Sequence, residues 1–174
     1  PGGSGVHMSV QTLASISRLD PVFMLKHEAP AGLQKLSSLV AARARGETGP
    51  FSIMASNNAL HFAQELARGA DGAISGVAYS DVLVQICRLY WDGEVERALD
   101  LNDAALPLFR HEAQGLFGHS VRKAFLVRRG ALSHDVCRYP GVTLTATENS
   151  ELDHLVARFD RRSRELGFNP NLSF

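Results

Sequence analysis

Between residues 22 and 90 the sequence alternates short apolar runs with longer segments in which apolar residues recur at helical spacing. The short runs lack polar alternation, so they predict strands buried on both faces at residues 22–26, 51–55 and 72–76. The longer segments predict amphipathic helices at residues 33–46, 59–69 and 81–90. Because strands that alternate with helices form right-handed βαβ units, this pattern predicts an α/β fold with a parallel sheet.

The rest of the chain carries helical patterns only. A first helix is expected near residues 9–17, and after Gly93 the pattern predicts helices at residues 95–106, 109–116, 121–128 and 148–166. Pro107 is expected to interrupt the helical pattern after residue 106. Three parallel strands alone would leave both outer edges open. We therefore expect the sheet to be completed by another segment, another copy or residues outside this chain.

Charge and composition argue against several classes of partner. Basic and acidic residues number 18 each, so the net charge gives no reason to expect nucleic acid or an anionic membrane. The basic cluster at residues 158–164 is interleaved with acidic residues and predicts a solvated helix face. Cys87 and Cys137 lack metal-ligand spacing and are expected to be buried thiols in a reducing cytoplasm. No apolar run approaches the length of a membrane span.

Polar and small residues follow each predicted strand. Lys26 closes the first strand, Ser56 and Asn57 follow the second, and the third ends in Ser75 and Gly76. The carboxyl ends of parallel strands meet on the ligand side of an α/β sheet. The sequence therefore predicts a site that combines an amine, small hydrogen-bonding groups and glycine-exposed backbone, which suits a small carbonyl compound.

Lys26 allows two interpretations. An amine at the rim of an apolar strand is partly desolvated, which disfavours its charged form, and only the neutral amine attacks a carbonyl to form a Schiff base. Alternatively, the stem of the lysine packs on apolar surface while its ammonium group reaches water. His27 and Glu28 are weaker candidates for proton transfer, and His27 is expected to be solvated in a loop.

Five segments carry a resemblance to a known family. PVFMLKHE is similar to a strand that bears a Schiff-base lysine, and GADGAISG is similar to the eighth strand of the same barrel. LNDAALPLFRHE with VRKAFLVRRG resembles the helices after that barrel, and PGGSG resembles the loop after its fifth strand. Together they resemble the dihydrodipicolinate synthase/N-acetylneuraminate lyase family of class I aldolases, over essentially all 174 residues.

The resemblance implies a fold and a set of site residues. Residues 1–92 would form the carboxyl-terminal part of a (βα)8 TIM barrel, and residues 93–174 an all-helical carboxyl-terminal extension. The first five strands would lie outside this chain. Lys26 would form the Schiff base, Ser4 and the backbone carbonyl of Ile74 would help to position the substrate, and Ser56 and Asn57 would line the pocket. Neither a metal nor an organic cofactor is expected, because the lysine itself supplies the electrophilic catalysis.

Departures from the family pattern bear on the substrate. Gly3 stands where the family has an arginine that holds the substrate carboxylate, and Ser4 replaces the neighbouring threonine. The resemblance thus implies a class I aldolase or lyase that acts on pyruvate or a related 2-keto acid and an aldehyde, with a substrate other than that of dihydrodipicolinate synthase. A cytoplasmic homo-oligomer is expected. The alternative is a non-catalytic barrel that binds a ligand or serves as a scaffold, which the missing arginine favours.

Overall fold

A computed structural model describes residues 6–28, 32–138 and 141–170 of the protein. The contacts divide the chain into two compact units, one that ends at Ser75 and one that begins at Gly76. The first unit contains the strands, and the second unit is helical.

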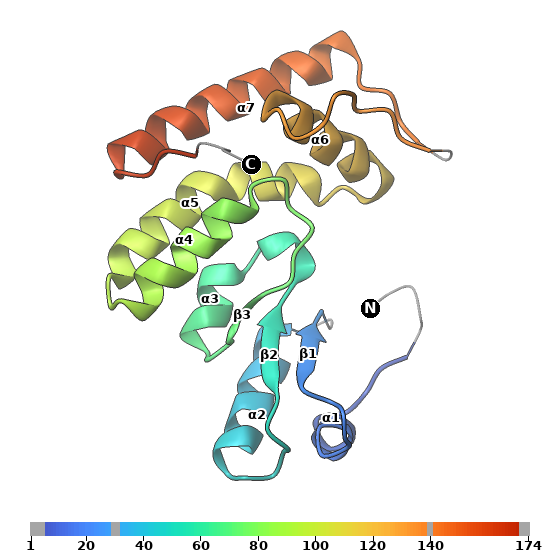
Figure 1. The fold of residues 1–174 in the computed structure, drawn as a ribbon, viewed down its shortest axis with the longest axis vertical. Helices are drawn as coiled ribbons and strands as arrows, with labels where there is room; N and C mark the ends of the chain where they lie inside the picture. Colours follow the sequence, from blue (N-terminus) through green and yellow to red (C-terminus); the bar gives the residue numbers. More distant parts are fainter. Residues whose placement is uncertain (1–5, 29–31, 139–140, 171–174) are drawn as a thin grey trace. The chain divides into compact units, whose positions relative to one another are not determined.

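The first unit is a parallel sheet with helices packed against it (Figure 1). Its strands follow the order β1-β2-β3, with bounds β1 Met24–His27, β2 Ser52–Ala55 and β3 Gly72–Ala73. Its helices are α1 Val10–Ile16, α2 Gly32–Ala44 and α3 Phe62–Ala67, with a short 3-10 turn η1 at Asn57–Ala59. The predicted α/β fold with a parallel sheet is therefore confirmed.

The two faces of the sheet differ in burial. Ile53 and Ala55 of β2 are buried on one face, and α2 lies behind β2 in the view of Figure 1. On the other face Met24 of β1 is 41% exposed. The prediction that every strand is buried on both faces is thus wrong for β1, because within the described residues the face that bears Met24 and Lys26 is exposed.

Arg43 and Asp71 tie the amino ends of β2 and β3 to the end of α2. The backbone N–H of Ile53 donates to Oδ2 of Asp71 at 2.8 Å, and the same carboxylate is paired with Arg43. Arg43 also donates to the carbonyl of Gly69 at 3.0 Å. One guanidinium group therefore holds the segment before β3 beside β2, which fixes the register of the strands.

The turn after β2 departs from the predicted helix. Asn57, Asn58 and Ala59 all have left-handed backbone, with φ of 52°, 52° and 59°. Asparagine adopts this conformation readily, whereas alanine adopts it rarely. As a result α3 begins at Phe62 and not at residue 59.

The second unit is built around one long helix. Its helices within the described residues are α4 Ser80–Trp91, α5 Val95–Glu112, α6 Gly115–Arg128 and α7 Ala146–Glu165. α5 contacts α4, α6 and α7, and its apolar side chains Leu101, Leu108 and Phe109 are fully buried. The predicted all-helical pattern after Gly93 is confirmed, while the domain boundary expected at residue 92 stays a prediction.

Pro107 does not interrupt α5, so the predicted break there is wrong. A proline in a helix interior removes one hydrogen bond and costs about 3 kcal/mol. The neighbouring Ala104, Ala105 and Leu108 are buried against the rest of the unit. Packing of this face offsets the cost of the proline, since tertiary contacts supply most helix stability in proteins.

A buried ionic network holds the segment that precedes α4. Both carboxylate oxygens of Glu112 accept from the backbone N–H of Ala78, at 3.0 and 3.1 Å, and Arg122 donates to the same group at 2.9 Å. Arg129 donates to the carbonyl of Ala78 at 2.6 Å and lies 4.2 Å over the ring of Tyr79. The two polar backbone groups of Ala78 are thus fixed by side chains of α5 and of the end of α6.

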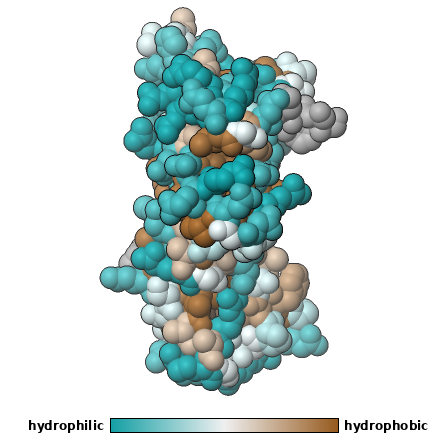
Figure 2. All heavy atoms as spheres, turned by 90° about the vertical axis from the view of Figure 1, so that its left-hand side faces the viewer, coloured by the Kyte–Doolittle hydropathy of each residue, from teal (hydrophilic) through white to brown (hydrophobic). Residues whose placement is uncertain are grey.

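The described surface carries separate hydrophobic patches within a mostly hydrophilic face (Figure 2). Among the described residues, no helix is both long enough and apolar enough to cross a membrane. Arg158, Arg161 and Arg164 are exposed on α7, which confirms the solvated helix face. Cys87 is buried as expected, but Cys137 is only half-buried.

We expect Pro107→Ala to stabilise the second unit. The substitution restores an N–H donor inside α5 and removes the clash of the proline ring, so the free energy of unfolding should rise by roughly 1–3 kcal/mol. Thermal unfolding followed by circular dichroism measures this change. An unchanged or lower midpoint temperature of unfolding would contradict this expectation and would show that α5 depends on the proline at this position.

Glu65 of α3 leads to a pH-dependent prediction. Its side chain is 5% exposed, and Oε2 has no hydrogen-bond partner among the described residues. Burial raises the pKa of Glu65 from about 4.5 to about 7. Between these pH values the folded state holds a proton that the unfolded state has released, so stability falls as the pH rises through this window.

Glu65→Gln removes this titration. Unfolding in urea should show the variant more stable than the parent at pH 8, by up to roughly 3 kcal/mol, and close to the parent at pH 4.5. Glu165 is exposed, so Glu165→Gln is the matched control and should leave the free energy of unfolding unchanged at both pH values. A constant difference between Glu65→Gln and the parent at both pH values would contradict the assignment.

Candidate functional site

Lys26 lies on the more exposed face of the sheet. Side chains alternate along a strand, so Lys26 shares its face with Met24, while Leu25 and His27 point to the other side. Nζ of Lys26 is 3.2 Å from Oε2 of Glu28, and the lysine side chain is 48% exposed. Within the described residues the amine is thus only partly shielded from solvent, and its desolvation stays a prediction.

Neighbouring residues on β2 and β3 complete a row across the sheet. The register pairs Lys26 with Met54 and Met54 with Gly72, so all three positions share one face. A Cβ at Gly72 would come within 2.9 Å of the terminal methyl group of Met54, and Gly72 has φ of +147°. Glycine is therefore required at this position both for its backbone conformation and for the space that Met54 fills.

Ile74 extends the same face beyond β3. Its backbone N–H donates to the carbonyl of Ala55 at 2.8 Å, and its side chain is 39% exposed. Alternation places residue 74 on the side of Gly72, and hence on the side of Lys26. The structure thus brings two predicted site residues, Lys26 and Ile74, onto one face of one sheet.

Ser56 and Asn57 lie at the carboxyl end of β2. Ser56 is buried, and its carbonyl accepts from the N–H of Ala59 at 3.0 Å. Asn57 is exposed, and its carbonyl accepts from Leu60 at 3.2 Å. Both residues belong to the left-handed turn, so their backbone is fixed locally. Ser4, the remaining predicted substrate-binding residue, lies outside the described residues.

His27 is not solvated, so that prediction is wrong. The strand continues one residue past Lys26, and alternation turns His27 to the helix side, where it is 3% exposed. Burial lowers its pKa, and the nearby positive charge of Lys35 adds to the effect. A neutral histidine on the opposite face from Lys26 is badly placed to exchange protons with it.

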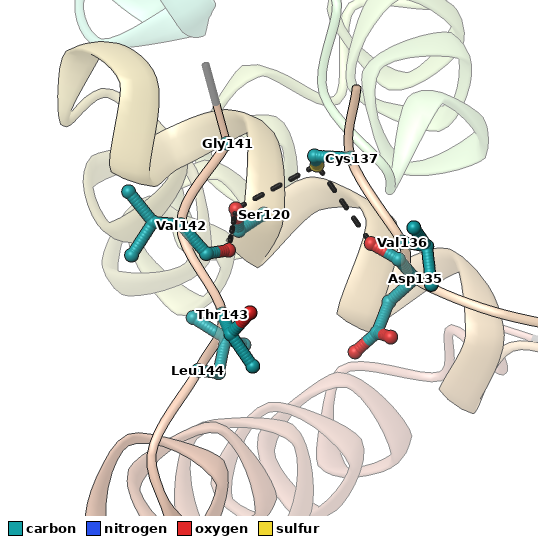
Figure 3. Close-up of a pocket in the computed structure, with 8 residues that line it drawn as sticks. All are labelled: Ser120, Asp135, Val136, Cys137, Gly141, Val142, Thr143 and Leu144. Carbon is teal, nitrogen blue, oxygen red and sulfur yellow. Dashed lines mark hydrogen bonds between the residues drawn. The ribbon is translucent and has the colours of Figure 1, made fainter. Parts of the chain in front are cut away.

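A separate cavity of about 220 Å³ lies in the second unit (Figure 3). Ser120 of α6 projects into it and donates to the carbonyl of Val142, with the thiol of Cys137 at 3.6 Å from the same hydroxyl. The cavity contains none of the predicted site residues. Within the described residues, no group of three or more His, Cys, Asp or Glu side chains is arranged to hold a metal ion.

Sequence reasoning missed two features of the face around Lys26. The first is the row through Met54 and Gly72, which follows from two-residue alternation once the strand register is known. The second is the ion pair with Glu28, which the same alternation signals because the two residues are two positions apart. Neither feature follows from composition or from the identity of a single residue.

A parallel sheet whose helices pack on one face, with a lysine on the other face, defines part of a (βα)8-barrel protein. Comparison with known families shows to which family of barrel proteins the chain belongs. Residues 1–158 match the Dihydrodipicolinate synthetase family, so this chain belongs to that family.

Curated relatives and solved structures agree with this membership. The chain is 27% identical over 158 residues to L-2-keto-3-deoxyarabonate dehydratase of Azospirillum brasilense, covering 90% of this chain and 50% of the relative. It is 24% identical to 4-hydroxy-tetrahydrodipicolinate synthase 1 of Halalkalibacterium halodurans, and the match covers 88% of this chain and 50% of that relative. The crystal structure of dihydrodipicolinate synthase from Rhodopseudomonas palustris matches with a TM-score of 0.83 at 39% identity, covering 87% and 50%.

The chain therefore spans about half the length of the relatives it matches. The chain itself is shown to belong to the family and to have the fold of part of the barrel. Members of this family are lyases. The reaction of the whole protein that contains this chain is proposed below.

Proposed function

We propose that the protein containing this chain is a class I lyase in which Lys26 forms a Schiff base with pyruvate or a related 2-keto acid. The position of Lys26 carries the proposal. It lies at the carboxyl end of β1, on the face that bears Met24 and Ile74 and away from buried His27. In a (βα)8 barrel the face away from the helices is the interior, and the carboxyl ends of the strands surround the active site.

The chemistry follows from the amine. Neutral Nζ attacks C2 of the keto acid, and loss of water gives an iminium ion. The iminium withdraws electrons from C3, which loses a proton and becomes an enamine. The enamine then expels a hydroxyl group from C4 or adds to an aldehyde, and hydrolysis returns the free lysine. A curated relative is named for a 2-keto-3-deoxy sugar acid and for a dehydration, which supports this substrate class.

Other residues would position the substrate. By the family resemblance, the backbone carbonyl of Ile74 would help to position the substrate near Lys26, since residue 74 directly follows β3. Ser56 and Asn57 would line the site from the end of β2, and Ser4 would contribute from the residues that precede α1 in the sequence. An oligomer is expected, with the remaining strands of the barrel supplied outside the residues of this chain.

A ligand-binding or scaffold protein is the second candidate. Two observations favour it: Lys26 is 48% exposed, and Gly3 lacks the side chain that would hold a substrate carboxylate. This candidate requires no covalent adduct at Lys26, so one experiment separates the two functions.

The test is reductive trapping. Protein expressed from its complete gene is incubated with pyruvate, reduced with borohydride and mapped by mass spectrometry. We expect a reduced adduct on Lys26, abolished by Lys26→Arg. The printed sequence holds two other lysines, Lys35 and Lys123, and Lys35→Arg is the matched control that should keep the adduct.

Folded protein that forms no adduct at Lys26 with any of a panel of 2-keto acids would contradict the proposed lyase. That result would favour the ligand-binding alternative.

A further inference from the structure

We propose that Glu28 is the acid–base partner of the Lys26 amine during Schiff-base formation; this inference rests on the proposed function. Oε2 of Glu28 is 3.2 Å from Nζ of Lys26, with the two side chains 35% and 48% exposed. The carboxylate therefore touches the atom that would react. It is also open enough for a substrate to approach from the same side.

The backbone of β1 sets this contact. Residues two apart in an extended chain project from the same face, and His27 between them is buried on the other face. The neighbouring positions on β2, Ser52 and Met54, carry no charge. Among residues 24–28 and 52–55, Glu28, which directly follows β1, is thus the one titratable group that shares a face with Lys26.

The pair differs from the other ion pairs among the described residues. In those pairs the cation is an arginine, as in Arg45 with Glu47 and Arg97 with Glu94. A guanidinium group keeps its proton, whereas an ammonium group can pass one to a carboxylate. An exposed ion pair adds only about 0–1 kcal/mol of stability, so a structural role gives little reason for this arrangement.

Schiff-base formation needs one group that takes a proton and later returns it. The Glu28 carboxylate takes a proton from the Lys26 ammonium, which leaves a neutral amine and a carboxylic acid. The nitrogen lone pair attacks C2 and the C=O electrons move to oxygen. One nitrogen proton then passes to that oxygen, which gives a carbinolamine. Glu28 returns its proton to the hydroxyl as the C–O bond breaks, so water leaves and the C=N bond forms.

The same contact explains how an exposed lysine can react. Direct proton transfer within the pair generates the neutral amine only when it is consumed by attack on a carbonyl. The carboxylic acid made in that step is then in place for the dehydration step.

The test compares Glu28→Gln with the parent protein expressed from its complete gene. The initial rate of the borohydride-trapped adduct at Lys26 and the deuterium exchange at C3 of pyruvate are measured from pH 5 to 9. We expect both rates to fall by about 100-fold in Glu28→Gln, as for loss of a general acid–base group. Glu47→Gln removes a carboxylate from another pair two residues apart and should match the parent.

Two further measurements separate catalysis from a structural role. Glu28→Asp should recover part of the rate. In Glu28→Ala added formate should raise the rate in proportion to its concentration, which a purely structural residue would not allow. Circular dichroism checks that each variant is folded.

The outcomes for the two proposals differ. If the parent forms the adduct at Lys26 and Glu28→Gln matches its rate and pH profile within about two-fold, the role of Glu28 is overturned while the lyase stands. If the parent forms no adduct with any 2-keto acid, the lyase fails, and the role of Glu28 fails with it.

Discussion

The pairing of β1 with β2 determines which way every side chain of β1 points. Leu25 lies beside Ile53 and Lys26 beside Met54, in parallel register. A slip of one residue would turn Lys26 toward the helices and bring His27 to the open face. Packing of Leu25 beside buried Ile53 opposes such a slip, because the slip would expose Leu25 and bury the charged end of Lys26 against the helices. The chemistry proposed for Lys26 and Glu28 therefore depends on a register that the hydrophobic core maintains.

Charged side chains in the second unit hold the backbone in place. Glu112 and Arg129 hold the N–H and the carbonyl of Ala78, four residues after Ile74 in the chain. Burial raises the pKa of Glu112 to about 7, although its bonds to Arg122 and Ala78 oppose this. Gly118 lets α6 approach the end of α5, since a Cβ there would lie 2.0 Å from the carbonyl oxygen of Glu112. These contacts fix the backbone at Ala78, shortly before α4 begins.

Sequence reasoning recovered the elements that hydrophobic periodicity controls. The three parallel strands and their helices follow from apolar runs, and the family resemblance drawn from PVFMLKHE and GADGAISG agrees with the match over residues 1–158. Reasoning failed where tertiary context overrides local preference. Pro107 is held inside α5 by the packing around it, and Ala59 adopts a left-handed conformation that its side chain disfavours. The prediction for His27 fails because β1 ends at His27 and not at the predicted Lys26. His27 therefore belongs to the strand, and its side chain points to the face opposite Lys26.

The most direct test of the account is a crystal structure of the protein after reduction with pyruvate. The account predicts continuous density from Nζ of Lys26 to C2 of the substrate, on the face of the sheet that bears Met54 and Gly72. Density for pyruvate bound elsewhere, or a lysine side chain on the α2 side of the sheet, would contradict it.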